Sequence, residues 1–319
     1  MNSKAILIKG DASFRKFYRF RSNKSSKIIV KAKKEKYKNL IVYSIINKFL
    51  RDNKILTPKV YSYNFFKGII IIEDFGDKSF YKLLMKKKNK FLIYKKLIDL
   101  LIKIQTVKIP SGPIKFGNKS YSMKKYSNKF LHKETDLFFD WYLPLFFNKK
   151  KTKRIKVVTK KVLSKLYNKL YFSNTCFVHR DYHVQNLMKV GSRIGVIDSQ
   201  DALIGNQVYD LVSIVDDVRI KTSNKLKNQI ISYYLRKKKI YKNEINNFLE
   251  DFNILSVQRS LKIIGIFSRL HKRDNKSKYL KYIPYTWKLL ENRINSKNFN
   301  ELKRELDKNV SKKLRKKIK

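Results

Sequence analysis

The stretch that decides the fold reads FVHRDYHVQNL and occupies residues 177–187. Within it, Asp181 is followed five residues later by Asn186, on a segment that reads as an irregular loop. A carboxylate and a side-chain amide that leave the same loop can converge on a single ligand. The stretch therefore predicts a loop that carries chemistry.

Two apolar arms, 187–190 and 194–197, follow this loop and flank a three-residue turn. Folded as an antiparallel hairpin, the arms set Asn186 opposite Asp198, with their Cα atoms about 5 Å apart. An amide oxygen and a carboxylate at that separation can share one octahedral Mg²⁺, whose ligand distances are about 2.1 Å. Asp181 then remains available to accept a proton.

This set of side chains is typical of phosphoryl transfer, in which one Asp orients a hydroxyl while an Asn and a second Asp hold metal on the ATP phosphates. Each residue could by itself cap a turn, but the three at this spacing favour a phosphoryl-transfer site. His179, just inside an apolar strand, is expected to pack and to orient the loop. His183 either packs in the same way or meets the substrate.

The rest of the chain divides into a strand-rich and a helical part. Apolar and β-branched runs separated by turn residues predict strands at 5–8, 14–21, 27–31, 60–66 and 68–72, and helical spacing predicts a helix at 35–51. From residue 78 onward the apolar period is 3.6, and only 176–198 interrupts it with short strands. The sequence therefore predicts an α+β, two-lobed, protein-kinase-like fold. A small β-rich, nucleotide-binding N-lobe would span 1–76, and a large helical C-lobe with the catalytic loop, metal site and substrate-binding region would span 77–319.

The chain is strongly basic. Its 319 residues include 76 Lys and Arg against 24 Asp and Glu, a formal net charge of +52. Such a charge first suggests nucleic acid or an anionic membrane surface. The lysines are scattered through every segment together with many Asn and Ile residues, as compositional drift would produce. We therefore expect no nucleic-acid partner; the denser basic runs at 149–161 and 311–319 are where a polyanion would bind if the charge were functional.

The single cysteine, Cys176, excludes an internal disulfide, which fits a reducing compartment. The apolar run at 5–8 is too short for a signal peptide. No run approaches the roughly 18 apolar residues that a membrane helix requires. We expect a cytoplasmic protein with no membrane partner.

Further motifs lie in order along nearly the whole chain. They read GDASFR at 10–15, IEDFGD at 72–77, DWYL at 140–143, GVID at 195–198, QDA at 200–202, YDLVS at 209–213, and a block from Gln258 to Asp274. With the loop at 177–187, they resemble the aminoglycoside phosphotransferase superfamily. More narrowly, the blocks at 10–15 and 258–274 resemble the anomeric N-acetylmuramate/N-acetylglucosamine kinases of bacterial cell-wall recycling.

The resemblance implies that Asp181 is the catalytic base and that Asn186 and Asp198 hold Mg²⁺. It also implies that backbone groups just after Glu73, at Asp74, form a hinge that binds the adenine of ATP.

Two further nucleotide contacts follow from the same resemblance. Ser13 would cover the phosphates with its backbone and hydroxyl. Lys31 stands where many kinases have the lysine of a Val-x-Lys motif, although the narrower family often has Asp there. Lys31 thus either pairs the ATP phosphates or is one more solvated lysine.

Basic residues recur at helical spacing in the block after residue 258. Together they form one stripe: Arg259, Lys262, Arg269 and Arg273. A muramate lactyl carboxylate would need such a partner, preferably a bidentate arginine, so Arg259 and Arg269 are candidate substrate residues. The alternative is a solvated helix face. Asp201 would either face the substrate or lie behind the residues that do.

The site residues predict an ATP- and Mg²⁺-dependent kinase, and the resemblance implies that it phosphorylates the anomeric hydroxyl of N-acetylmuramate or N-acetylglucosamine in peptidoglycan recycling. Its partner would be a small amino sugar. Two alternatives stay open. One is a kinase for another small alcohol, such as an aminoglycoside, choline or another sugar, and the other is a catalytically silent module that binds polyanions. The sequence does not specify an oligomeric state.

Overall fold

The computed structural model describes residues 5–8, 15–22, 25–33, 37–87 and 89–317. The chain forms two compact units, of which the first joins 1–124 to 176–204 and the second joins 125–175 to 205–319. Residues 77–124 and 176–204 thus group with the N-terminal sheet, so the two units do not follow the lobe boundary expected after residue 76. That division into lobes stays a prediction.

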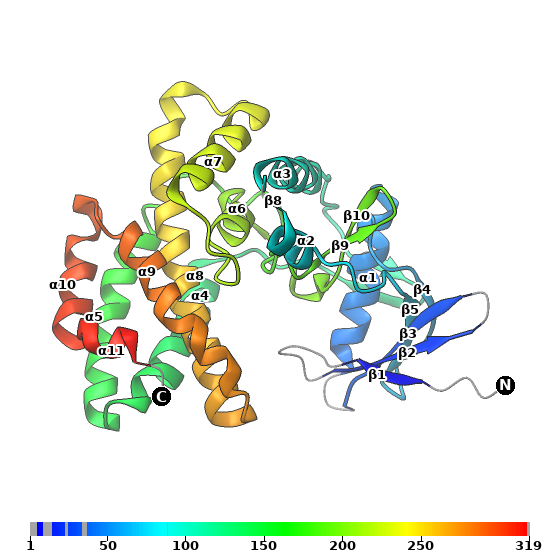
Figure 1. The fold of residues 1–319 in the computed structure, drawn as a ribbon, viewed down its shortest axis with the longest axis horizontal. Coiled ribbons are helices and arrows are strands. Elements are labelled where there is room, and N and C mark those ends of the chain that lie inside the picture. Colours follow the sequence, from blue (N-terminus) through cyan, green and yellow to red (C-terminus); the bar gives the residue numbers. More distant parts are fainter. Residues whose placement is uncertain (1–4, 9–14, 23–24, 34–36, 88, 318–319) are drawn as a thin grey trace. The chain divides into compact units, whose positions relative to one another are not determined.

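The first unit is built on a five-stranded antiparallel sheet in the order β1-β2-β3-β5-β4 (Figure 1). Its strands are β1 (Ile6–Ile8), β2 (Lys16–Arg21), β3 (Ser26–Lys31), β4 (Val60–Asn64) and β5 (Ile69–Glu73). Helix α1 (Lys38–Asp52) covers one face, and its Leu40 and Tyr43 join the buried cluster that contains Ile28 and Val30 of β3. The predicted β-rich segment and its helix are confirmed.

Among its described residues, the first unit also contains two α-helices and several short strands. They are α2 (Phe80–Lys86), α3 (Phe91–Gln105), and the strands β6 (Ile114–Phe116), β7 (Lys119–Tyr121), β8 (Cys176–Val178), β9 (Leu187–Val190), β10 (Arg193–Val196) and β11 (Leu203–Gly205). The pattern missed β6, β7 and β11 because each has only three residues, too few for a visible alternation. Tertiary contacts stabilise the β6–β7 hairpin, since the Phe116 ring lies 5.2 Å from that of Tyr63 on β4.

The described part of the second unit is helical. It contains α4 (Asn128–Leu137), α5 (Lys149–Tyr167), α6 (Val208–Val215), α7 (Asn224–Lys238), α8 (Ile245–Asp274), α9 (Ile283–Arg293), α10 (Asn300–Asn309) and α11 (Lys312–Lys316), besides shorter turns. Helix α8 crosses the end of α4 at Gly265, where a Cβ atom would lie 2.3 Å from the carbonyl carbon of Leu137. Only glycine allows this approach, which explains its place inside a 30-residue helix.

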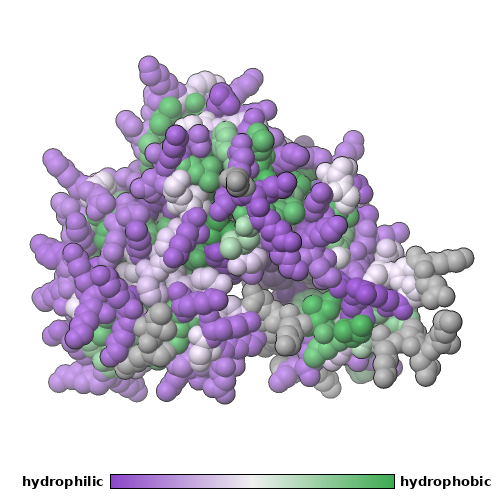
Figure 2. Space-filling view, viewed as in Figure 1, coloured by the Kyte–Doolittle hydropathy of each residue, from purple (hydrophilic) through white to green (hydrophobic). Residues whose placement is uncertain are grey.

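Polar and charged side chains cover most of the face drawn in Figure 2. Cys176 is buried, as its apolar setting suggests. Among the described residues, every helix is either too short or too polar to serve as a bilayer-spanning segment.

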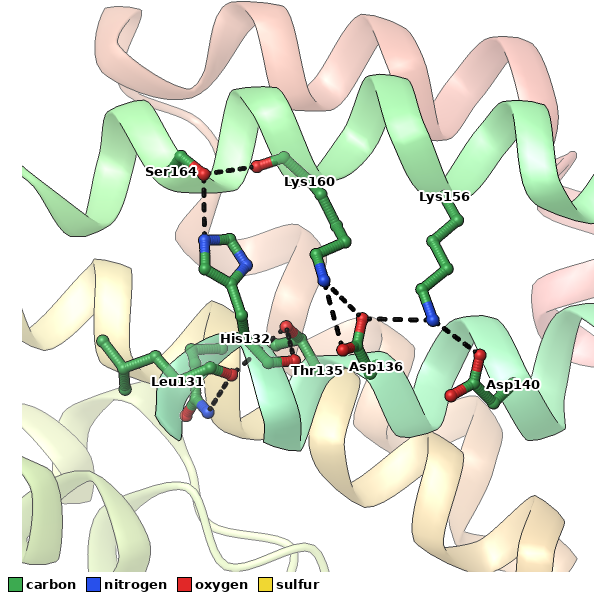
Figure 3. Close-up of polar contacts among 9 residues, drawn as sticks. Leu131, His132, Thr135, Asp136, Asp140, Lys156, Lys160 and Ser164 are labelled. Atoms are coloured by element: carbon green, nitrogen blue, oxygen red, sulfur yellow. Dashed lines mark hydrogen bonds and ion pairs between the residues drawn. The ribbon is translucent and has the colours of Figure 1, made fainter. Parts of the chain in front are cut away.

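A polar cluster joins α4 to α5 in the second unit (Figure 3). Lys160 pairs with Asp136 at 2.9 Å, and the Ser164 Oγ atom lies 2.9 Å from Nε2 of His132. Because the Ser164 hydroxyl donates its proton to the Lys160 carbonyl, it accepts from an N–H at His132 Nε2. Burial, together with the charge of Lys160, lowers the pKa of His132, although Asp136 opposes this effect.

We expect His132 to make the protein less stable in mild acid. The pKa of His132 in the folded protein lies below its value of about 6.5 in the unfolded chain. The unfolded chain therefore binds the proton first as the pH falls, and the free energy of unfolding decreases below about pH 6.5. Urea unfolding between pH 7.5 and 5.5 should therefore show a smaller loss in His132→Gln than in the wild type. Equal pH slopes in the two proteins would contradict this prediction.

Candidate active site

Tertiary contacts on both sides of Asp181 hold the loop between β8 and β9. His179 is fully buried, and its Nε2 atom lies 3.1 Å from the Ile197 carbonyl oxygen. Tyr182 is also fully buried, and its hydroxyl donates to the Leu97 carbonyl of α3 at 2.7 Å. Arg180, between His179 and Asp181, adopts a positive φ of 70°. The loop thus presents Asp181, which is half-buried, between two anchored neighbours, and the expected packing role of His179 is confirmed.

The structure brings Asp181 and Asn186 together. The Asn186 side-chain amide donates to the Asp181 carbonyl oxygen at 3.1 Å, and the backbone N–H of Asn186 donates to the His183 carbonyl at 2.9 Å. The first of these bonds uses the amide nitrogen, so it fixes the orientation of the whole amide group. The amide oxygen is then the atom that Asn186 can offer to a ligand.

The predicted register of the β9–β10 hairpin is wrong by one residue. Val196 pairs with Leu187, and the Ile197 N–H donates to the Asn186 carbonyl at 3.0 Å, so Ile197 and not Asp198 lies opposite Asn186. The cause is the turn, which has two residues and not three, with Gly191 at a φ of +59°. Two-residue turns of this kind match the twist of the flanking strands.

Asp198 follows directly after the residue that pairs with Asn186. Its backbone is left-handed, with φ 68° and ψ 40°, and turns the chain out of the hairpin. Its carboxylate forms an ion pair with the guanidinium of Arg15, which also donates to the Gln200 side-chain oxygen at 3.1 Å. The Asp198 side chain keeps 36% of its surface exposed, whereas that of Arg15 keeps 5%.

The donor set fits a magnesium ion held partly by a nucleotide. Within the described ranges, no group of three or more His, Cys, Asp and Glu side chains could form a metal site. Mg²⁺ does not need such a cage, because it commonly binds one or two protein carboxylates together with substrate phosphates and water. The Asn186 amide oxygen and the Asp198 carboxylate are hard oxygen ligands of the kind this ion prefers.

The segment after β5, where the adenine hinge is expected, is held by side-chain contacts. Glu73 accepts from the Lys59 N–H at 3.1 Å, and Asp74 pairs with Arg19 at 2.6 Å. Their side chains therefore serve the fold, and a hinge of backbone groups after Glu73 stays a prediction. Phe75 lies so close to Gly195 of β10 that a Cβ atom there would be 2.5 Å from its ring.

The other candidate residues of the first unit have varied settings. Lys31 is exposed, with its ammonium 5.5 Å from the centre of the Tyr18 ring. His183 is buried. Asp201 is half exposed, and its backbone carbonyl accepts from Arg180 at 3.0 Å. Ser13 lies outside the described residues.

Most of the expected basic stripe of α8 is not a solvated helix face, although the Arg273 side chain at its end is 55% exposed. Arg259 and Lys262 are buried, and Arg269 is partly buried. Lys262 pairs at 2.7 Å with the buried carboxylate of Glu134 from α4, so this lysine neutralises a charge inside the second unit. Arg259 and Arg269 stay predictions as substrate residues.

Comparison with known proteins places the chain in a family. The model of the phosphotransferase enzyme family, APH, matches residues 4–242, and the chain belongs to that family. It is a small-molecule phosphotransferase with a protein-kinase-like fold. The resemblance inferred from the motifs is thereby confirmed at the family level.

Two curated relatives are distant but match nearly the whole chain. The N-acetylmuramate/N-acetylglucosamine kinase of Pseudomonas aeruginosa is 26% identical over 288 residues, which cover 89% of this chain and 82% of that protein. The enzyme of the same name from Neisseria meningitidis is 25% identical over 278 residues, which cover 86% and 80%.

Solved structures share the fold. The ADP-bound aminoglycoside phosphotransferase APH(2'')-Ib has a TM-score of 0.62 at 13% identity, covering 90% of this chain and 92% of that one. Spectinomycin phosphotransferase APH(9)-Ia, in complex with ADP and spectinomycin, has a TM-score of 0.59 at 17% identity, covering 95% and 92%. At such identities the likeness establishes the architecture alone.

We predict that Asp74 stabilises the segment after β5 more than Asp77 does, although both carboxylates pair with Arg19. Burial raises the pKa of Asp74, but hydrogen bonds from Ser26, Arg19 and the Gly76 N–H outweigh this and lower it. Asp74→Ala leaves Arg19 buried with one partner fewer, and should cost about 3 kcal/mol in the free energy of unfolding.

The matched control is Asp77→Ala, which removes a carboxylate whose side chain is 61% exposed. Such a change should cost less than about 1 kcal/mol. Urea unfolding at neutral pH measures both losses. A loss at Asp77 as large as that at Asp74 would show that burial does not decide the strength of these pairs.

Proposed function

We propose that this phosphotransferase moves the γ-phosphoryl group of ATP to the anomeric hydroxyl of an amino sugar, N-acetylmuramate or N-acetylglucosamine. The near-full-length similarity to enzymes of that name supports the acceptor. The observation that carries the reaction is the hydrogen bond between Asn186 and the Asp181 backbone, next to the turn that presents Asp198. The two similar solved structures, both bound to ADP, support an adenine nucleotide as the phosphoryl donor.

Each polar residue of the loop has a separate task in this proposal. The Asp181 carboxylate accepts the proton of the sugar hydroxyl while the hydroxyl oxygen attacks the γ-phosphorus of ATP. ADP leaves from the opposite side of the phosphorus. The anchors at His179 and Tyr182 keep this carboxylate in place. Asn186 and Asp198 would hold Mg²⁺, which when bound offsets negative charge on the phosphates. Catalysis then depends mainly on positioning and electrostatics.

Replacement of Asp181 tests the assigned base. We expect Asp181→Asn to lower kcat by at least about a hundredfold, because the amide cannot accept the proton, while the affinity for ATP stays nearly unchanged. Asp52→Asn is the control, since it makes the same chemical change at an exposed carboxylate of α1. Normal turnover in Asp181→Asn would refute the assignment.

The acceptor is tested by ADP release over a panel of alcohols with Mg²⁺ and ATP. We expect turnover with N-acetylmuramate or N-acetylglucosamine, and a product that mild acid hydrolyses, because sugar 1-phosphates are acid-labile while primary phosphate esters are not. Phosphorus NMR identifies the new bond. An acid-stable product, or turnover only with an aminoglycoside or choline, would instead favour a kinase for another small alcohol.

A catalytically silent module would behave differently in the same assay. Such a protein would release no ADP with any acceptor. It would also bind polyanions with a steep salt dependence, owing to its net charge of +52.

A further inference from the structure

We propose that Arg15 is the cation that pairs the nucleotide phosphates in this site, and that Lys31 is not. The proposal rests on the proposed function, since it concerns the residues that meet ATP. Its basis is the placement of Arg15 and Lys31 relative to the two faces of the N-terminal sheet.

Arg15 belongs to the face of the sheet that α1 covers. Its guanidinium lies 5.5 Å from the ring centre of Phe17 and 5.9 Å from that of Tyr43. Phe17 packs against the buried cluster between the sheet and α1, and Tyr43 is part of that cluster. These two rings hold the arginine side chain in one place, so its donors are oriented before a ligand arrives.

The segment that begins with Asp198 lies on this same face. Ser199 donates to the side-chain oxygen of Asn47 on α1 at 2.5 Å, in a fully buried hydrogen bond. The ion pair between Arg15 and Asp198 and the bond from Arg15 to Gln200 are part of the same contact. The arginine therefore touches the carboxylate that is the proposed metal ligand.

Lys31 lies on the opposite face. Successive side chains of a strand alternate, and Ile28 and Val30 of β3 are the ones that join the cluster under α1. Lys31 thus points away from α1, and its ammonium lies over Tyr18, which pairs with Ile29 across β2 and β3. A cation on that face is on the wrong side of the sheet to reach Asp198.

The charge balance gives Arg15 a function in nucleotide binding. A nucleoside triphosphate next to Asp198 brings more negative charge than one divalent cation neutralises. A buried arginine adds both a positive charge and a planar set of donors that fits phosphate oxygens. Asp198, which remains partly exposed, is the acceptor that occupies this guanidinium in the structure.

Nucleotide affinity tests the proposal without depending on turnover. Calorimetry measures the binding of ATP and of adenosine, both with Mg²⁺, to the wild type and to Arg15→Gln, Arg15→Lys and Lys31→Gln. Removal of a charged hydrogen bond should weaken ATP binding at least about tenfold in Arg15→Gln. Adenosine binding should change less than about twofold, because adenosine has no phosphate, and Arg15→Lys should restore part of the loss.

The matched control is Lys16→Gln, which removes an exposed cation from the residue next to Arg15. It should leave both affinities unchanged, and so should Lys31→Gln. The proposal fails if Arg15→Gln binds ATP as the wild type does, or if Lys31→Gln alone loses ATP affinity. It also fails if Arg15→Gln loses ATP and adenosine in parallel, since that result indicates a purely structural residue.

The outcomes separate this inference from the proposed function. A wild type that binds ATP in an Arg15-dependent way but phosphorylates no amino sugar would overturn the acceptor and keep the assignment of Arg15. A wild type that binds no nucleotide would overturn both.

Discussion

The main chain of Ile197 is the point on which the candidate site depends. Its carbonyl oxygen lies in hydrogen-bond contact with the His179 ring, and its N–H donates to Asn186. One residue thus connects the start of the loop between β8 and β9, its end and the turn at Asp198. Hydrogen bonds to this one residue therefore hold His179 and Asn186, which lie on either side of Asp181, next to the turn that begins at Asp198.

Acidic residues are scarce in this chain, and several of them serve as buried counter-charges. Glu134 pairs with Lys262 inside the second unit, Asp216 pairs with Lys227 and Arg293, and Asp74 pairs with Arg19. Burial opposes the ionisation of Asp216, but the charges of Arg293 and Lys227 and their hydrogen bonds outweigh it and lower its pKa. Each of these three buried acids thus has at least one basic partner beside it.

Much of the fold could be predicted because its signals are local. Runs of β-branched residues marked the strands around Ile29 and Ile71, and a period of 3.6 marked α3 and α8. The hairpin register could not be predicted reliably, because both apolar arms accept either pairing and only the positive φ of Gly191 selects the two-residue turn. The burial of Lys262 on α8 could not be predicted either, because its partner Glu134 is more than a hundred residues away in the sequence.

The sequence by itself determined which chemical groups the site can offer, since Asp181, Asn186 and Asp198 are fixed positions of the covalent chain. Only the tertiary structure decided which cation accompanies them. In a chain this rich in basic residues, the sequence does not distinguish the roles of Arg15 and Lys31. In the structure, Arg15 lies under α1 beside Asp198, whereas the Lys31 ammonium lies over the Tyr18 ring. The physical reason is that a sheet has two faces, and the pairing of β2 with β3 and the packing of α1 assign each side chain to one of them.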